Sequence, residues 1–226
     1  MGTGSGASYK PYVQVAEFGS SGTAGRVVDW KNGRVVHLLS QVEIYFWYMI
    51  RWNDEVLDIR EQFPLDLKET EKIADEFGIN HPSNKGEHTV MTTDLFVTTT
   101  KGDVAFSIKR NKKFSERTLE KLFLEKQYWE RRSIPWKLIT VEDFNMTTAR
   151  NIRDVVAFYN ESFFPDKISF LKFLVARKFI TIDLSKDLNW KEQINEHEDE
   201  IKRFENSVSE ISLNDNHLSK EVKKNG

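Results

Sequence analysis

The order of apolar and polar residues divides roughly the first 140 residues into alternating helices and strands. Large apolar residues dominate 38–52 (LLSQVEIYFWYMIRW), which predicts a buried helix with Ser40 as its N-cap. Apolar and polar residues alternate over 56–65 (VLDIREQFPL), which predicts a strand that Pro64 ends. A more polar helix is expected over 68–77.

A β-hairpin is the clearest local signal in the chain. Two runs rich in Thr and Val, 89–100 and 103–110, are separated by Lys101-Gly102. A helix with apolar residues every three or four positions follows over 115–132, and 134–141 has the composition of a short buried strand. Together these segments predict a mixed α/β domain.

The pattern changes after residue 142. Two helices are expected over 148–160 and 165–177, with a small strand over 179–184, and this combination suits a winged-helix module. The expected domains are a flexible leader (1–25), an α/β domain (26–141), a smaller and mainly helical winged-helix-like domain (142–190) and a charged helix that continues into a disordered tail (191–226).

Composition excludes several classes of protein. The chain has no cysteine, which excludes a disulfide scaffold, a thiolate zinc site and a cysteine nucleophile. It has no apolar run long enough to span a membrane, and its first residues lack the basic and apolar regions of a signal peptide. We therefore expect a soluble, intracellular protein with no membrane partner.

Charge is distributed unevenly along the chain. A net charge of −2 argues against a protein that coats nucleic acid through bulk charge. Residues 54–76 contain nine acids and three bases, whereas residues 101–137 contain eleven bases and five acids. The second segment can attract phosphate locally, although a solvated amphipathic helix also explains such a run.

The predicted hairpin brings an acid and a lysine together. With a two-residue turn at Lys101-Gly102, Asp94 lies directly opposite Lys109, on the face of the sheet that also carries Ser107. The two side chains would then be about 5 Å apart. A three-residue loop would instead place Asp94 opposite Arg110, and an exposed ion pair between strands would give the same pattern without any catalytic role.

An acid on one strand followed by acid-x-Lys on the next is the pattern of nucleases with the restriction-endonuclease fold. Carboxylates in such a site hold divalent ions, and the lysine positions water or stabilises developing negative charge. Here the second element is Ser107-Ile108-Lys109, with serine where an acid or glutamine is expected. Glu43 belongs to a Ser40-x-x-Glu43 capping box, which explains a glutamate there without any metal.

Six segments of the chain resemble the TnsA family, the endonuclease subunits of heteromeric cut-and-paste transposases in bacteria. The resemblance runs from about residue 26 to residue 140, and the DIREQFPL and MTTD strings are its most specific parts. In order, the segments are GRVVHLLSQVE (33–43), VLDIREQFPLD (56–66), FGINHP (77–82), VMTTDLF (90–96), RTLEKL (117–122) and IPWKLIT (134–140).

The resemblance implies a restriction-endonuclease-like catalytic core, a mixed sheet flanked by helices, followed by the winged-helix-like domain. Ser107 departs from the family pattern, and a hydroxyl is a poorer ligand for a hard cation than a carboxylate. Gln62 is a further candidate for the same site. By resemblance, the catalytic residues are Glu43, Asp94 and Lys109, and the metal ligands are Glu43, Asp94, Ser107 and the backbone carbonyl of Ile108.

The implied activity is a magnesium-dependent endonuclease, with manganese as a substitute, that cuts the 5′ (non-transferred) strands at transposon ends in the bacterial cytoplasm. A TnsB-like integrase would make the 3′ cuts, and a TnsC-like AAA+ ATPase would control both. Bases gather directly after the lysine of the hairpin. Those expected to contact double-stranded DNA are Arg110, Lys112, Lys113, Arg117 and Lys121.

Two alternatives belong to other classes of protein. If Ser107 disables metal binding, the chain is a catalytically weakened assembly subunit of the transposase. If only the catalytic domain is shared with the family, the chain is a general restriction or repair nuclease of the same fold.

Overall fold

The structure, a computed structural model, describes residues 2–14 and 24–206. The chain divides into two compact units, Met1–Ile152 and Arg153–Gly226, and each unit is described by itself. The division falls later in the chain than the change of pattern expected at residue 142. No helix among the described residues is long and apolar enough to cross a membrane.

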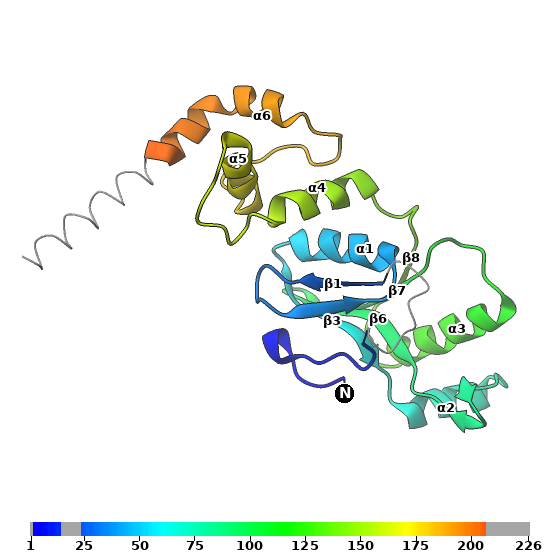
Figure 1. The fold of residues 1–226 in the computed structure, drawn as a ribbon. Coiled ribbons are helices and arrows are strands. Elements are labelled where there is room, and N and C mark those ends of the chain that lie inside the picture. The colour runs from blue at the N-terminus through cyan, green and yellow to red at the C-terminus, as the bar shows by residue number, and fades with distance from the viewer. Residues whose placement is uncertain (1, 15–23, 207–226) are drawn as a thin grey trace, which may run out of the picture. The chain divides into compact units, whose positions relative to one another are not determined.

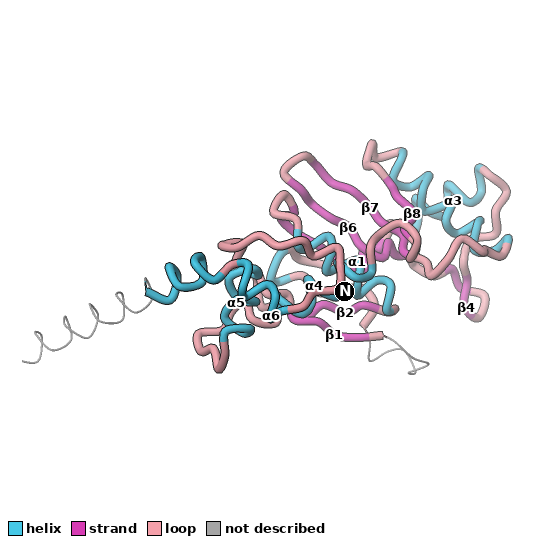
Figure 2. The backbone as a smooth tube through the Cα atoms, turned by 90° about the horizontal axis from the view of Figure 1, so that it is seen from above, coloured by secondary structure: helices cyan, strands magenta, loops and turns pink. Residues whose placement is uncertain are grey.

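A four-stranded mixed sheet forms the centre of the first unit (Figure 2). β3 (Val56–Pro64), β6 (Thr92–Thr99) and β7 (Gly102–Ile108) are antiparallel neighbours in that order. β8 (Trp136–Ile139) pairs with β7 in parallel, since the helix between them carries the chain back across the sheet. β3, β6 and β8 lie within segments in which the sequence predicts strands, and β7 begins one residue before its predicted segment.

Helices pack on both faces of this sheet (Figure 1). α1 (Gln41–Trp52) lies on one face, where Phe46 contacts Phe106 of β7 with ring centroids 5.2 Å apart. α2 (Leu67–Glu76) and α3 (Glu116–Glu130) lie on the other face and share a hydrophobic core with it. That core consists of Leu65, Ile73, Ala74, Phe96, Ala105, Leu124, Tyr128 and Trp129. The predicted mixed α/β core is therefore confirmed.

A two-stranded ribbon, β1 (Gly25–Val28) with β2 (Val35–Leu38), is joined to β3 by a buried ion pair. Two guanidinium nitrogens of Arg34 lie 2.7 Å from the two carboxylate oxygens of Glu61. The backbone amide of His37 also donates to this carboxylate, at 3.0 Å. Because Arg34 and Glu61 are both buried, this pair fixes the ribbon against the sheet.

Residues 2–14, which we expected to belong to a flexible leader, are ordered and pack on β3. Tyr9 is buried, and its hydroxyl donates to the backbone carbonyl of Glu61 at 2.9 Å. A short 3-10 turn, η1 (Gly6–Ser8), precedes it. The glycine and serine content predicted flexibility, but one buried aromatic residue is enough to anchor the segment. The expectation is corrected for these residues, and 15–23 lie outside the described residues.

The hairpin between β6 and β7 turns one residue earlier than predicted. Thr99 faces Gly102, so the turn consists of Thr100 and Lys101. The Thr99 hydroxyl donates to the Gly102 carbonyl at 2.8 Å and accepts from the Lys101 amide at 3.1 Å. These two side-chain bonds stabilise the observed turn, and Gly102 begins β7 with a φ of 122°.

The corrected register changes the predicted partner of Asp94 but keeps the predicted face. The ladder ends with Leu95 opposite Phe106, and one further step places Asp94 opposite Ser107 instead of Lys109. The pairing has moved by two residues, and side chains on a strand alternate with a period of two. Asp94, Ser107 and Lys109 therefore still belong to one face of the sheet.

The second unit is helical wherever it contains regular secondary structure among its described residues. α4 (Met146–Val156) crosses the boundary between the units, and α5 (Lys167–Ala176) and α6 (Trp190–Glu196) follow. Residues 198–206 form a further helical segment. The expected charged helix after residue 190 is thus present, while 207–226, the expected disordered tail, lie outside the described residues.

The strand predicted over 179–184 is absent from the structure. Lys178 has a φ of 60° and stops α5, and the amides of Phe179 and Ile180 both donate to the Leu174 carbonyl, at 2.8 and 3.3 Å. These bonds complete the helix end and occupy donors that a strand would need. Because the second unit has no strand among its described residues, the small β element of the expected winged-helix module is missing.

Candidate active site

Asp94 and Lys109 meet at one end of the central sheet. Lys109 follows β7 directly, and its ammonium Nζ lies 3.0 Å from Asp94 Oδ2, on β6. The same carboxylate oxygen accepts the Ile108 amide at 2.6 Å, and Lys109 Nζ also donates to the Ile108 carbonyl at 3.0 Å. The sequence predicted this pair, and the long lysine side chain reaches across the shifted register.

Glu43 enters the site from the first turn of α1. Ser40 is the N-cap, and its hydroxyl accepts the Glu43 amide at 3.2 Å, as predicted. The Glu43 carboxylate returns to the cap: Oε1 accepts from the Ser40 hydroxyl and Oε2 from the Leu39 amide, each at 2.9 Å. The capping box therefore engages both oxygens; Oε1 keeps a free lone-pair direction for a further partner, whereas Oε2 also accepts from Gln62.

Gln62 holds the Glu43 carboxylate from β3. Its Nε2 lies 3.4 Å from Glu43 Oε2, and its Oε1 accepts from the Thr92 hydroxyl at 3.3 Å. Gln62 has a φ of 47°, in the left-handed region, which interrupts the strand alternation and lets Glu61 and Gln62 both be buried. The DIREQ string (58–62) thus contains Glu61, which forms the ion pair with Arg34, and Gln62, which orients Glu43.

Ser107 is 1% exposed and its hydroxyl donates to Oε2 of Glu125, a residue of α3 that the sequence analysis did not single out. Oε1 of Glu125 accepts from the Thr93 hydroxyl at 2.9 Å, which in turn accepts Trp129 Nε1 at 2.6 Å. The available signal was an acid on the inward face of an amphipathic helix, between Leu122 and Trp129. The Ser107 side chain is therefore engaged with a carboxylate from the neighbouring helix.

Negative charge accumulates in this site. Burial and the nearby charge of Asp94 raise the pKa of Glu43 to about 7. Burial and the same charge also raise the pKa of Glu125 to about 7, although its bond from Ser107 and the charge of Lys109 oppose the shift. Burial disfavours the charged form of Lys109, but the charge of Asp94 and its hydrogen bond outweigh this and raise the lysine's pKa.

The donor set fits a hard divalent cation that DNA and water complete. Carboxylate and carbonyl oxygens are the ligands that magnesium prefers, and Glu43, Asp94 and Ile108 offer them. Within residues 2–14 and 24–206, no group of three or more His, Cys, Asp or Glu side chains is arranged to hold an ion alone. Magnesium commonly binds through one or two carboxylates together with water and substrate phosphate.

The raised pKa values predict that the stability of the metal-free protein falls as pH rises. Glu43 and Glu125 keep protons in the folded state that they lose in the unfolded state above about pH 4.5, so the free energy of unfolding should decrease between about pH 4.5 and 7. We expect a loss of about 1–3 kcal/mol over this range. Urea denaturation in EDTA at pH 5 and pH 8 measures it.

Glu125→Gln provides the control for this prediction, because it keeps a polar side chain that cannot titrate. The variant should show a flatter pH dependence, and comparison with the wild type cancels groups such as His81, whose burial lowers its pKa and acts in the opposite direction. Equal slopes for the two proteins would contradict the assignment of a raised pKa to Glu125.

The basic residues expected to contact DNA differ in their surroundings. Arg110 lines a hollow of about 390 Å³ together with Glu43 and Lys109. Arg117 is already bound within the chain, since its guanidinium lies 2.6 Å from both the Asn80 carbonyl and a Glu120 carboxylate oxygen. The remaining three bases, all exposed, are Lys112, Lys113 and Lys121.

The amino-acid sequence is similar to those of known proteins. Residues 53–141 match the family model described as TnsA-like endonuclease N terminal. The transposon Tn7 transposition protein TnsA of Escherichia coli is 42% identical over 155 residues, which are 67% of this chain and 57% of that protein. The chain thus spans a little over half the length of this relative. Its mixed sheet flanked by helices fits a restriction-endonuclease-like core. Over residues 53–141 the chain is similar to the TnsA-like endonucleases.

Proposed function

We propose that the chain is a magnesium-dependent DNA endonuclease that cuts the 5′ strands at transposon ends during cut-and-paste transposition. The similarity to TnsA-like endonucleases supports the reaction class. The observation that carries the proposal is the convergence of Glu43, Asp94 and Lys109, from three separate elements, around one buried cluster of carboxylates. Such a cluster with one lysine suits hydrolysis of a phosphodiester.

Each residue has a defined role in this proposal. Glu43, Asp94 and the Ile108 carbonyl would hold the cation, which would activate water and neutralise charge on the scissile phosphate. Lys109 is held by two hydrogen bonds of 3.0 Å at the edge of this group. Because its pKa is raised, Lys109 stays protonated and acts as a cation and hydrogen-bond donor to the phosphate or to the attacking water, not as a base.

Glu125 brings a carboxylate to the side chain of Ser107, at the position where the family pattern has an acid or glutamine. The Ser107 hydroxyl and the Thr93 hydroxyl each donate to one of its oxygens and fix its orientation. Glu125 also lines a hollow together with Lys109, so its carboxylate is near the lysine that touches Asp94. In this proposal Ser107 positions a carboxylate from the helix and the site keeps three acidic side chains.

The proposal assigns the other reactions of transposition to partners. A TnsB-like integrase would cut the 3′ strands, and a TnsC-like AAA+ ATPase would control both cuts. The sequence has no glycine-rich phosphate-binding loop of its own, so ATP hydrolysis falls to the second partner. Double-stranded DNA at the transposon ends is the substrate.

A cleavage assay with all three proteins tests the function. A plasmid with the transposon ends is incubated with the chain, the integrase and the ATPase, and the 5′-strand and 3′-strand breaks are mapped separately. We expect 5′ breaks with Mg²⁺ or Mn²⁺ and none when this chain is omitted. Calorimetric titration of the isolated chain with Mn²⁺ gives a second readout that needs no partner. Cutting of plain duplex by the chain alone would instead indicate a general nuclease.

A further inference from the structure

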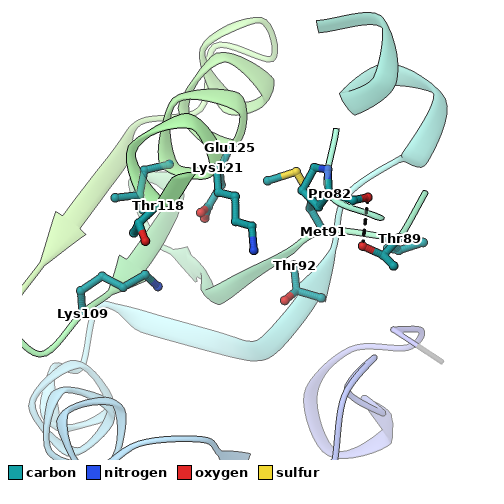
Figure 3. Close-up of a pocket in the computed structure, with 10 residues that line it drawn as sticks. Pro82, Thr89, Met91, Thr92, Lys109, Thr118, Lys121 and Glu125 are labelled. Atoms are coloured by element: carbon teal, nitrogen blue, oxygen red, sulfur yellow. Dashed lines mark hydrogen bonds between the residues drawn. The ribbon is translucent and has the colours of Figure 1, made fainter. Parts of the chain in front are cut away.

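A second hollow lies beside Lys109. It is enclosed by α3 and by residues 82–92, and its volume is about 260 Å³ (Figure 3). Lys109 lines both hollows. Because Lys109 also contacts Asp94, the second hollow adjoins the place proposed for the scissile phosphate.

The lining of the second hollow combines charge, hydroxyls and apolar surface. Figure 3 shows the Lys121 side chain extending into the space from α3, with Thr92 facing it from β6 and Thr118 on the same helix. Met91 and Leu122 add apolar wall. An ammonium with hydroxyls is suited to a phosphate, and apolar side chains are suited to the face of a nucleobase.

Lys121 is available for a ligand. It is exposed, and its side chain makes no hydrogen bond or ion pair with any residue in the described ranges. Arg117, one turn earlier on α3, differs from Lys121 because its guanidinium already donates to Glu120 and to the Asn80 carbonyl. Glu125 also lines the hollow, but its two oxygens are bonded by the Thr93 and Ser107 hydroxyls. A lysine that forms no ion pair, beside an apolar wall, indicates a site for an anionic ligand with a flat apolar part.

We propose that this hollow binds one unpaired nucleotide of the cut strand, next to the scissile phosphate. Its phosphate would contact Lys121, and its base would pack against Met91 and Leu122. The volume of the hollow, about 260 Å³, is smaller than that of pockets that hold drug-sized ligands. It therefore suits a single base rather than several nucleotides of DNA. This inference rests on the proposed nuclease function and adds that the substrate is locally unpaired beside the cut.

Binding without cleavage tests this inference. The full chain is titrated in EDTA with a fluorescent duplex and with the same duplex carrying one unpaired nucleotide. We expect the wild type to bind the second duplex about tenfold more tightly, the contribution of burying one base against the apolar wall. Met91→Trp and Thr118→Phe fill the hollow from two different walls and should each reduce this ratio to about one.

Lys113→Gln is the matched control for Lys121→Gln. Lys113 is exposed and does not line the hollow, so its loss should weaken binding of both duplexes by the same factor, whereas Lys121→Gln should lower the ratio between them. A ratio of one in the wild type, or an unchanged ratio in both filled variants, would overturn the inference. Because no cleavage is measured, such a result leaves the proposed endonuclease activity to its own test.

Discussion

Asp94→Asn should reduce 5′-strand cleavage by a factor of about a thousand or more, and Lys109→Met should have an effect of similar size. Asp94 receives the Ile108 amide and the Lys109 ammonium on one oxygen, which leaves the other for a cation. Asparagine keeps the size and one acceptor but removes the charge that holds the ion. Methionine keeps the apolar stem of the lysine and removes its donor.

The complete transposase mixture with magnesium is the assay for these variants, with the 5′ and 3′ breaks counted separately. The 3′ breaks should persist, since the proposal assigns them to the integrase. Lys101→Met is the matched control: Lys101 lies in the exposed hairpin turn, where it pairs with Glu55 at 2.6 Å, far along the strands from the site. Near wild-type 5′ cutting by both site variants would refute the catalytic assignment.

Part of this site could be predicted because strand alternation tolerates an error in register. The hairpin pairing differs from the prediction by two residues, and Asp94, Ser107 and Lys109 still share a face. A shift of one residue would have separated them. Glu43 became a candidate only through the family resemblance, since its capping box explains a glutamate there without a catalytic role.

The rest of the site depends on contacts between distant segments. Glu125 faces Ser107 only because the inward side of α3 packs on the sheet. The sequence of an amphipathic helix with a single inward glutamate does not predict which residue of the sheet that glutamate will contact. The hairpin turn depends on the Thr99 side chain, which bonds Gly102 and Lys101. The order of residues 2–14 likewise depends on where Tyr9 is buried, against β3. The secondary-structure propensities of single residues predict none of these tertiary contacts.

Arg34→Met should destabilise the first unit by about 3–5 kcal/mol, because it leaves the carboxylate of Glu61 buried without a counter-charge. Glu61 is fully buried, and without Arg34 its carboxylate would keep only the His37 amide as a hydrogen-bond donor within the described residues. A domain is stable by about 5–15 kcal/mol, so this is a large fraction. Urea denaturation, monitored by tryptophan fluorescence, measures the change.

Two further variants separate the charge effect from simple loss of a contact. The double variant Arg34→Met/Glu61→Leu removes both charges and should recover much of the lost stability, since a buried ion pair can be replaced by apolar residues at little cost. Arg131→Met breaks an exposed pair with Glu76 and should cost less than about 1 kcal/mol. If the double variant were no more stable than Arg34→Met, the buried charge would not be the cause. Because Gln62 follows Glu61 on β3 and contacts Glu43, the single variant should also disorder the carboxylate cluster, which links the ion pair of the ribbon to the chemistry of the site.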